Sequence, residues 1–152
     1  MHAWESLYSN SAVLRTVVGF VHIAGLVIGG GCAIVADRAT ILAYRRGASS
    51  RATELDAIRG AHRIVLAGLV AVAISGALLL GADLQTYLHS RIFWLKMGLV
   101  GLLLINGGAL KNLAQRASVD DGRWRRLAYA SGISLSLWLL TTLAGAALPN
   151  VG

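Results

Sequence analysis

Cysteine and proline each occur once in this chain of 152 residues, and acidic side chains number only seven. A single cysteine can neither form an intrachain disulfide nor supply the cysteine-rich ligand set of a structural zinc site. Only 14% of the residues are charged, against about 25% in a soluble domain, while 56% are hydrophobic. These shortages exclude a disulfide scaffold, a zinc module and a disordered tail, and they argue against a soluble enzyme.

The hydrophobic residues are concentrated in four runs, residues 12–36, 60–82, 92–113 and 127–148. Each run has about 20 residues or more, which is enough for a helix to cross the roughly 30 Å hydrocarbon core of a bilayer. The alternating pattern of a membrane strand is missing, so each run must close its backbone hydrogen bonds as a helix. We therefore predict a single all-α domain over residues 1–152, an integral membrane four-helix bundle whose first helix is retained rather than cleaved as a signal.

The charged residues predict an orientation. One connection carries Arg38, Arg45, Arg46, Arg51, Arg59 and Arg63, and another carries Lys111, Arg116, Arg123, Arg125 and Arg126. The connection between the second and third runs carries only Arg91. The positive-inside rule then places both basic connections in the cytoplasm and both termini outside, in a bacterial-type inner membrane. Contact with the lipid bilayer accounts for the net charge of +7, and no nucleic-acid partner is needed.

One face of the first predicted helix carries polar side chains. Spacings of three and four residues align Arg15, Gly19, His22, Leu26, Gly29 and Ala33. His22 lies near the bilayer centre, where a neutral imidazole is either a hydrogen-bonded structural residue or a haem or metal ligand. Comparable faces carry Ser131, Ser134, Trp138, Thr141 and Gly145 in residues 127–148, and Gly68, Ala71, Ser75 and Ala82 in residues 60–82. We interpret these two faces as helix packing.

Lys96 is the second ionisable residue inside a predicted span. Its side chain can extend back to the outer surface, or it can turn inward. If it turns inward it can reach the level of His22, because the two residues differ in depth by only about 6 Å. The two residues are therefore candidates to flank one cofactor. His62 lies at the cytoplasmic end of its helix, too far in depth to share that cofactor, and His89 lies in an outer loop.

Other signatures of known chemistry are missing from the sequence. There is no phosphate-binding glycine loop, no C-x-x-C-H haem attachment and no H-E-x-x-H motif. The acidic residues Asp37, Asp83, Asp120 and Asp121 all fall at span ends or in loops. A proton-coupled transporter or a cation channel usually needs a carboxylate inside the membrane or a discontinuous helix, and we expect neither here.

Short motifs in three of the spans resemble those of a known family. The segment Val21-His22-Ile23, in a first span that ends at Asp37-Arg38, resembles the opening of the HemJ-type membrane protoporphyrinogen oxidases. Residues 93–100, FWLKMGLV, are similar to the W-x-K-x-x-L-V pattern of that family's third span. The second span, which opens with His62-Arg63, fits the same layout. The related copper-resistance D-type membrane domains share the four-span arrangement, so the resemblance is to a superfamily.

This resemblance implies a bundle that holds haem b, with His22 and Lys96 as the key pair. His22 would ligate the iron, Lys96 would be a second ligand or a catalytic charge partner, and Arg15 would contact a haem propionate. The implied activity is that of an oxidoreductase resembling protoporphyrinogen oxidase, which oxidises protoporphyrinogen to protoporphyrin with haem as the redox cofactor and an electron acceptor outside the protein. Two alternatives stay open: a non-enzymatic subunit or scaffold that forms a homo-oligomer or joins a larger redox complex, and a copper-handling membrane domain. The copper alternative has only Met1, Cys32 and Met97 as sulfur ligands.

Overall fold

The computed structural model describes residues 2–116 and 121–151, and every element in these two ranges is a helix. In chain order they are α1 (His2–Asn10), α2 (Ala12–Gly25), the π-helical turn η1 (Leu26–Gly30), α3 (Gly31–Arg46), α4 (Ala48–Ala82), α5 (Leu84–His89), α6 (Arg91–Arg116) and α7 (Asp121–Val151). Four stretches are long and apolar enough to cross a membrane: Ala12–Arg46, Leu55–Ala82, Arg91–Arg116 and Asp121–Leu148. The prediction of an all-helical fold with four candidate spans is confirmed.

The helix ends follow local chemistry. The hydroxyl of Ser11 accepts a hydrogen bond from the Leu14 amide and caps the start of α2. From there α2, η1 and α3 form one uninterrupted helix to Arg46. Gly47 ends it with a φ of 96°, a conformation that favours glycine, and the chain turns directly into α4. The first connection between spans is therefore much shorter than the sequence indicates.

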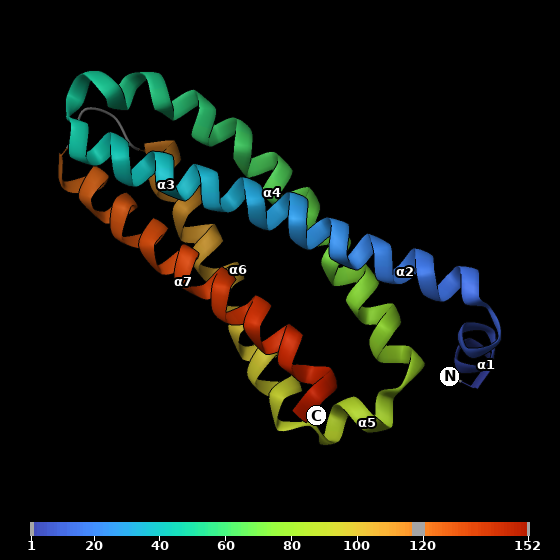
Figure 1. Ribbon diagram of the computed structural model, residues 1–152. Coiled ribbons are helices and arrows are strands. Elements are labelled where there is room, and N and C mark those ends of the chain that lie inside the picture. The colour runs from blue at the N-terminus through green and yellow to red at the C-terminus, as the bar shows by residue number, and fades with distance from the viewer. Residues whose placement is uncertain (1, 117–120, 152) are drawn as a thin grey trace.

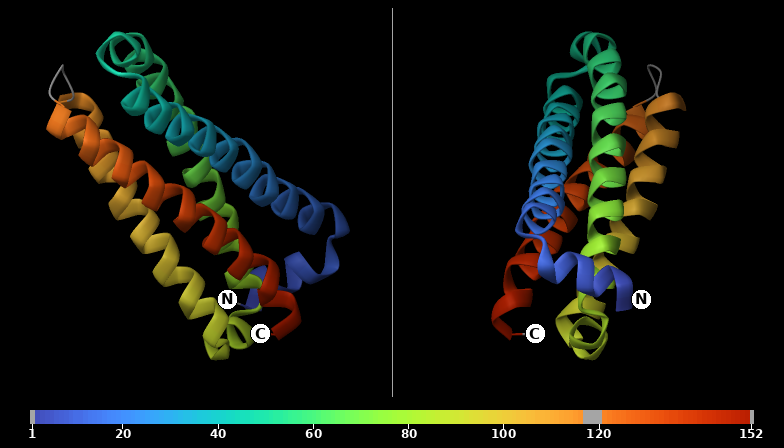
Figure 2. Two further views of the ribbon diagram at one scale, coloured as in Figure 1. Left: turned by 60° about the vertical axis from the view of Figure 1, so that its left-hand side comes forward. Right: turned by 90° about the vertical axis from the view of Figure 1, so that its right-hand side faces the viewer.

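The helices pack as two antiparallel pairs (Figures 1 and 2). The continuous helix α2–η1–α3 lies along α4, α6 lies along α7, and α3 packs on α7 to join the pairs. Within the described residues, α2 is not among the elements that pack substantially on α6 or α7. The bundle is consequently tight where α3 meets α7 and wider toward α1 and the end of α7 (Figure 1).

Three glycines set the close approach of α2–η1 to α4. A Cβ on Gly68 would lie 2.6 Å from the Cα of Gly29, and a Cβ on Gly25 would lie 3.1 Å from the Gly68 carbonyl oxygen. Gly25 and Gly29 form a G-x-x-x-G pair, a spacing that lets two helix backbones come together in a membrane. This crossing fixes the register of the antiparallel pair, and one turn before Gly25 it places His22 opposite Ser75.

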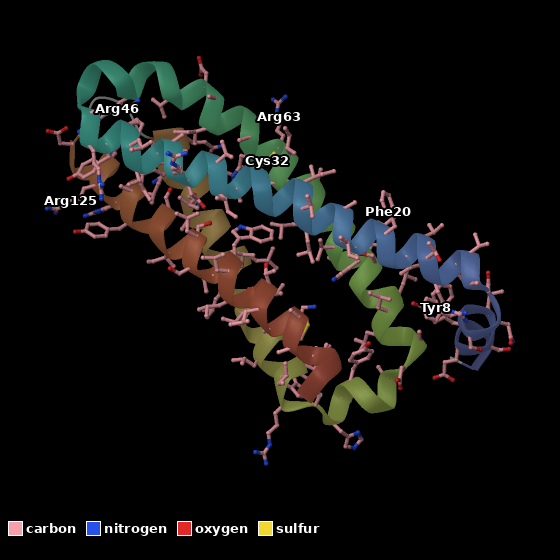
Figure 3. All side chains as sticks on the ribbon, in the orientation of Figure 1. Tyr8, Phe20, Cys32, Arg46, Arg63 and Arg125 are labelled. Carbon is pink, nitrogen blue, oxygen red and sulfur yellow. The ribbon has the colours of Figure 1, made fainter. Side chains whose placement is uncertain are left out.

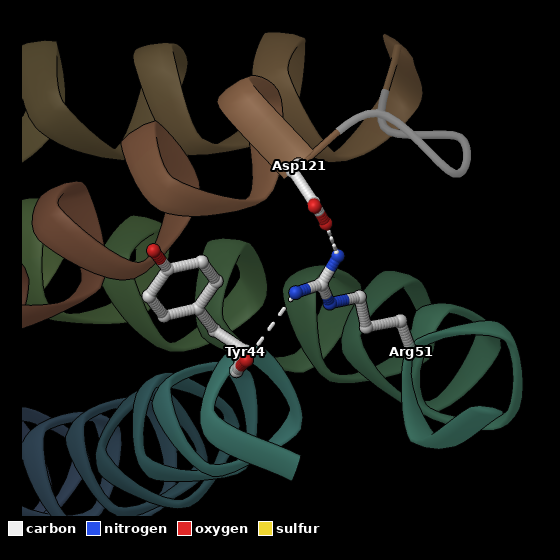
Figure 4. A network of polar contacts seen from close by, with 3 residues as sticks. All are labelled: Tyr44, Arg51 and Asp121. Carbon is white, nitrogen blue, oxygen red and sulfur yellow. Dashed lines mark hydrogen bonds and ion pairs between the residues drawn. The ribbon is translucent and has the colours of Figure 1, made fainter. Parts of the chain in front are cut away.

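The end of the bundle that contains the α3–α4 turn and the start of α7, which we call the narrow end, has its own core. Ala43, Ala114, Trp124 and Leu127 form a buried cluster there. The Arg51 guanidinium stacks on the rings of Tyr44 and Trp124, with centroid distances of 5.4 and 5.7 Å. It also donates to the Tyr44 carbonyl oxygen and forms an ion pair with Asp121 (Figure 4). These contacts join the α3–α4 turn to the start of α7, although Arg51 is predicted to lie in a loop.

A second buried layer crosses the middle of the bundle. It consists of Ala33, Leu103 and Trp138, with Leu69 packed against them. The Trp138 ring lies on Gly30, where a Cβ would stand 3.2 Å from the ring carbons Cε3 and Cζ3. A glycine at position 30 therefore gives the indole the space to fill the centre of the bundle.

Large apolar side chains cover the outer surface (Figure 3). Phe20 on α2 is 69% exposed and Ile105 on α6 is 73% exposed, and many leucines, valines and isoleucines point outward in the same way. A soluble protein rarely exposes apolar area on this scale, whereas lipid tails cover it without cost. The protein is therefore a multi-pass membrane protein.

Candidate functional site

His22 lies in the last turn of α2, half-buried against α4. A Cβ on Gly76 would be 3.3 Å from its Cε1 atom, so the absence of a side chain at position 76 leaves room for the ring. The ring atom Nδ1 is 3.0 Å from the Ser75 hydroxyl oxygen. The His22 side chain is thus held in place by residues of α4.

The hydrogen bonds around Ser75 favour one tautomer of His22. The Ser75 hydroxyl lies 2.6 Å from the carbonyl oxygen of Ala71 and 3.2 Å from that of Val72, and either can accept its single proton. When that proton points to a carbonyl, the hydroxyl oxygen accepts from His22 and the ring proton is on Nδ1. Nε2 then carries the lone pair that a metal would bind. Hydrogen bonds of this kind from the second ring nitrogen orient histidines that ligate metals.

His22 and Lys96 line the same cavity, which has a volume of about 400 Å³. The remaining lining is largely apolar: Leu26, Leu69, Val72, Ala73, Gly76, Ala77, Leu79, Leu80, Tyr87, Phe93, Met97, Val100, Leu103, Leu104, Trp138, Thr141 and Leu148. We call this space the His22 cavity. Its size and its few polar groups are typical of a small-molecule or cofactor site.

The Lys96 side chain is turned toward the interior. It is half-buried, and a Cβ on Gly145 of α7 would lie 3.4 Å from its Nζ atom. The missing side chain at position 145 therefore makes room for the ammonium group. Of the two orientations open from the sequence, the structure adopts the one that directs Lys96 toward the cavity. The two ionisable residues that the sequence singles out within the spans thus share one site.

Thr141 adds a third polar group, one that the sequence interpretation missed. Its side chain is 4% exposed and lines the His22 cavity, and its Oγ1 atom has no hydrogen-bond partner among the described residues. The sequence places Thr141 on a polar face of its helix, a face that we interpret from the sequence as helix packing. A buried hydroxyl without a partner is costly, so a ligand that pairs with it gains binding energy.

The His22 cavity opens sideways, between α4 and α6. Its exposed lining residues are Ala73 and Ala77 on α4 and Met97 and Leu104 on α6. The lining residues from α2 and α7 are buried or half-buried. Because the rim is apolar, the opening faces the lipid.

Arg15 is not brought to this cavity. Its guanidinium donates to the carbonyl oxygens of Tyr8 and Ser9 at the end of α1, and it is absent from the described lining. Carbonyl groups at a helix C-terminus attract a cation, which gives Arg15 a structural use. The Trp4 indole donates to the Leu78 carbonyl oxygen at 3.0 Å, and this bond fastens α1 to α4.

Asp37 is more buried than the sequence indicates. The helix does not end near Asp37 but continues to Arg46, and the Asp37 residue is 5% exposed. Asp37 lines a second cavity together with His62 and Lys111. Leu69, Leu103 and Trp138 line both cavities and form the wall between them.

A metal site built from protein ligands alone is not found in the described part of the chain. No group of three or more histidine, cysteine, aspartate or glutamate side chains comes together there. Of the three sulfur residues considered for copper, Met97 lines the His22 cavity, Cys32 is half-buried on α3, and Met1 is outside the described residues. A haem iron has a smaller requirement, because the porphyrin supplies four nitrogens and the protein needs to supply only one ligand.

Comparison with known proteins identifies no relative. The chain matches no protein-family model, no curated protein and no solved structure. Its function must therefore be argued from the geometry of the cavities.

Proposed function

We propose that this protein binds haem b in the His22 cavity, where His22 would ligate the iron and Lys96 would be a second ligand or a charge partner. One observation carries the proposal: His22, held by a hydrogen bond to Ser75, lines the same apolar cavity as Lys96. A neutral imidazole with a free Nε2 is a common protein ligand of haem iron.

The cavity suits a porphyrin in four respects. Its apolar lining matches the faces of the macrocycle, and its lateral opening admits a flat, lipid-soluble molecule from the bilayer. Lys96 and Thr141 offer polar partners for the charged or polar edge of such a ligand. Burial between helices also excludes water from the iron ligand, which keeps the local dielectric constant low.

The activity that we propose is the oxidation of a porphyrinogen to the porphyrin, as in the protoporphyrinogen oxidases that the sequence resembles, with the electrons passing to an acceptor outside the protein. Bound haem would supply one-electron oxidation and reduction. The chain's own residues would do the rest: Ser75 orients His22, Trp138 closes the inner wall, and Lys96 places a positive charge beside the ligand. Lys96 is the residue that we propose as catalytic.

We further propose that both termini lie outside a bacterial-type cytoplasmic membrane. The α3–α4 turn and the start of α7 lie together at the narrow end of the bundle, where Arg45, Arg46, Arg123, Arg125 and Arg126 are found. The positive-inside rule places such an end in the cytoplasm. Cysteine labelling with a membrane-impermeant reagent at single engineered sites near each end tests this assignment.

The absorption spectrum of the purified protein tests the haem proposal. Full-length protein expressed with ample haem and purified in detergent is expected to show a Soret band, and His22→Ala is expected to lose it. His62→Ala and His89→Ala are the matched controls, because both remove a histidine outside the His22 cavity, and both are expected to keep the band. A colourless wild-type protein, or an unchanged band in His22→Ala, would overturn the proposal.

A second candidate function is that of a membrane subunit that forms a homo-oligomer or joins a larger complex. Glycines on α6 favour it: a Cβ added to Gly98, Gly101 or Gly108 would meet nothing within 4 Å, so this face can accept another helix closely. An assembly role predicts an oligomer in detergent that survives His22→Ala and Lys96→Ala but is dissociated by Gly101→Leu. A monomeric wild-type protein would exclude a homo-oligomer.

A further inference from the structure

The second cavity, which we call the Asp37 cavity, has a volume of about 360 Å³ and lies between α3, α4, α6 and α7. The Trp138 layer closes it toward the centre of the bundle, and Ala114 and Leu127 of the buried cluster at the narrow end close it on the other side. Only four of its lining residues are exposed: Arg63, Leu66, Lys111 and Gln115. All four belong to α4 or α6, so the cavity opens sideways between these two helices.

The inner surface of the Asp37 cavity carries a buried carboxylate next to serine hydroxyls. Asp37 and Ser131 are 5% and 0% exposed, and neither the Asp37 Oδ2 atom nor the Ser131 hydroxyl has a hydrogen-bond partner within the described ranges. Ser131 and the buried Ser134 both lie beside this carboxylate. A buried carboxylate oxygen without a partner is expensive, and a cationic donor is the group that compensates it best.

The rim of the cavity has the opposite character. Arg63 and Lys111 are exposed at the opening, and His62 is half-buried beside them. His62 and Arg63 belong to α4 and Lys111 belongs to α6, so basic groups from both helices stand at the opening. Guanidinium and ammonium groups are the side-chain groups that bind a phosphate.

We propose that the Asp37 cavity binds an amphipathic zwitterion, with a primary ammonium inside against Asp37 and a phosphate at the rim against Arg63 and Lys111. This is the chemistry of an ethanolamine phosphate group, whether it belongs to phosphatidylethanolamine or to a water-soluble ester. A primary ammonium has three donors, enough for the Asp37 carboxylate and the Ser131 hydroxyl together. A choline headgroup has none, so the site distinguishes the two. The site is separate from the His22 cavity and does not depend on haem.

Native mass spectrometry of the full chain in detergent tests the assignment with defined probes. Phosphatidylethanolamine is expected to bind about tenfold or more tightly than phosphatidylcholine or phosphatidylglycerol of the same acyl chains. The reason is that neither of the other two headgroups has a primary ammonium that can donate a hydrogen bond to the Asp37 carboxylate. Asp37→Asn and Ser131→Ala are expected to abolish this preference. Lys111→Gln is expected to weaken phosphatidylethanolamine and phosphatidylglycerol alike.

Asp56→Asn is the matched control, since it removes an exposed carboxylate of α4 that is not in the lining, and it should leave the preference intact. Glycerophosphoethanolamine distinguishes the two sources: binding as tight as that of the lipid identifies a soluble ester as the ligand, and weaker binding identifies the lipid. Helical circular dichroism establishes that each variant is folded. The proposal is overturned if wild-type protein binds the three lipids equally, or if folded Asp37→Asn and Ser131→Ala both keep the preference.

Discussion

His22 and Ser75 are joined across α2 and α4 by a hydrogen bond of 3.0 Å, and the Ser75 hydroxyl also lies 2.6 Å from the Ala71 carbonyl oxygen. The serine therefore orients the histidine and favours the tautomer with the proton on Nδ1. A side chain that was interpreted as packing in the sequence is a positioning residue in the proposed site.

Replacing Ser75 tests this relationship. In Ser75→Ala the Nδ1 proton loses its acceptor, so the ring can rotate and change tautomer. We expect haem affinity to fall about 10- to 100-fold and the Soret band to shift, as measured by haem titration of the apoprotein in detergent. Ser136→Ala is the control, because that hydroxyl donates to the Gly132 carbonyl oxygen on its own helix. Equal affinities in Ser75→Ala and wild-type protein would remove Ser75 from the site.

A second prediction concerns the helix crossing at Gly68. In Gly68→Ala the new methyl group meets backbone atoms of Gly29 and Gly25 at 2.6–2.9 Å, and backbone cannot move aside as a flexible side chain can. We expect a loss of about 1–3 kcal/mol in stability, measured by thermal or denaturant unfolding in detergent. Gly60→Ala on the same helix meets nothing within 4 Å, and it should raise stability by about 0.5–1 kcal/mol. Equal stabilities of the two variants would mean that the crossing is looser than described.

The Arg51–Asp121 pair is expected to be energetically unequal. Arg51 is 8% exposed and stacked on Tyr44 and Trp124, whereas the Asp121 side chain is 85% exposed. Asp121→Asn should therefore cost less than about 1 kcal/mol, as for a surface ion pair. Arg51→Ala should cost about 2 kcal/mol or more, because it also removes the stacking contacts. The comparison is made by unfolding both variants in one detergent, and a larger loss in Asp121→Asn would contradict it.

Arg15 provides a test that separates α1 from the cofactor. Because its guanidinium bonds to the carbonyl oxygens at the end of α1, Arg15→Ala should loosen α1 and leave the His22 cavity unchanged. Hydrogen–deuterium exchange should become faster in α1, with an unaltered Soret band. A lost or shifted band would place Arg15 at the ligand, as the family resemblance implies.

Hydrophobic runs were sufficient to predict the helical class and the four candidate spans, because a membrane accepts few other structures. The ends of the helices were harder to predict. Charged residues normally mark the limit of a span, yet α3 passes Asp37 and reaches Arg46, and α4 begins at Ala48. The sequence pattern records hydrophobicity, and it does not record that a neighbouring helix will bury a carboxylate.

Part of the candidate site was also accessible from the sequence. His22 and Lys96 stand out because ionisable residues are rare within spans, and their similar depths predicted that they could share a ligand. Their partners Ser75 and Thr141 could not be identified in this way, because small polar residues occur on many packing faces. Which of them meets the histidine depends on the register set by Gly25, Gly29 and Gly68.

The open sides of the two cavities have a consequence for how ligands arrive. Both cavities face the gap between α4 and α6, and the exposed rim of the His22 cavity carries only apolar side chains. A porphyrin entering there must first partition into the bilayer and then diffuse in two dimensions to the protein. The quantity that governs its occupancy is thus its mole fraction in lipid rather than its concentration in water. In detergent, the apparent dissociation constant should accordingly rise as more detergent is added, because the added micelles dilute the porphyrin.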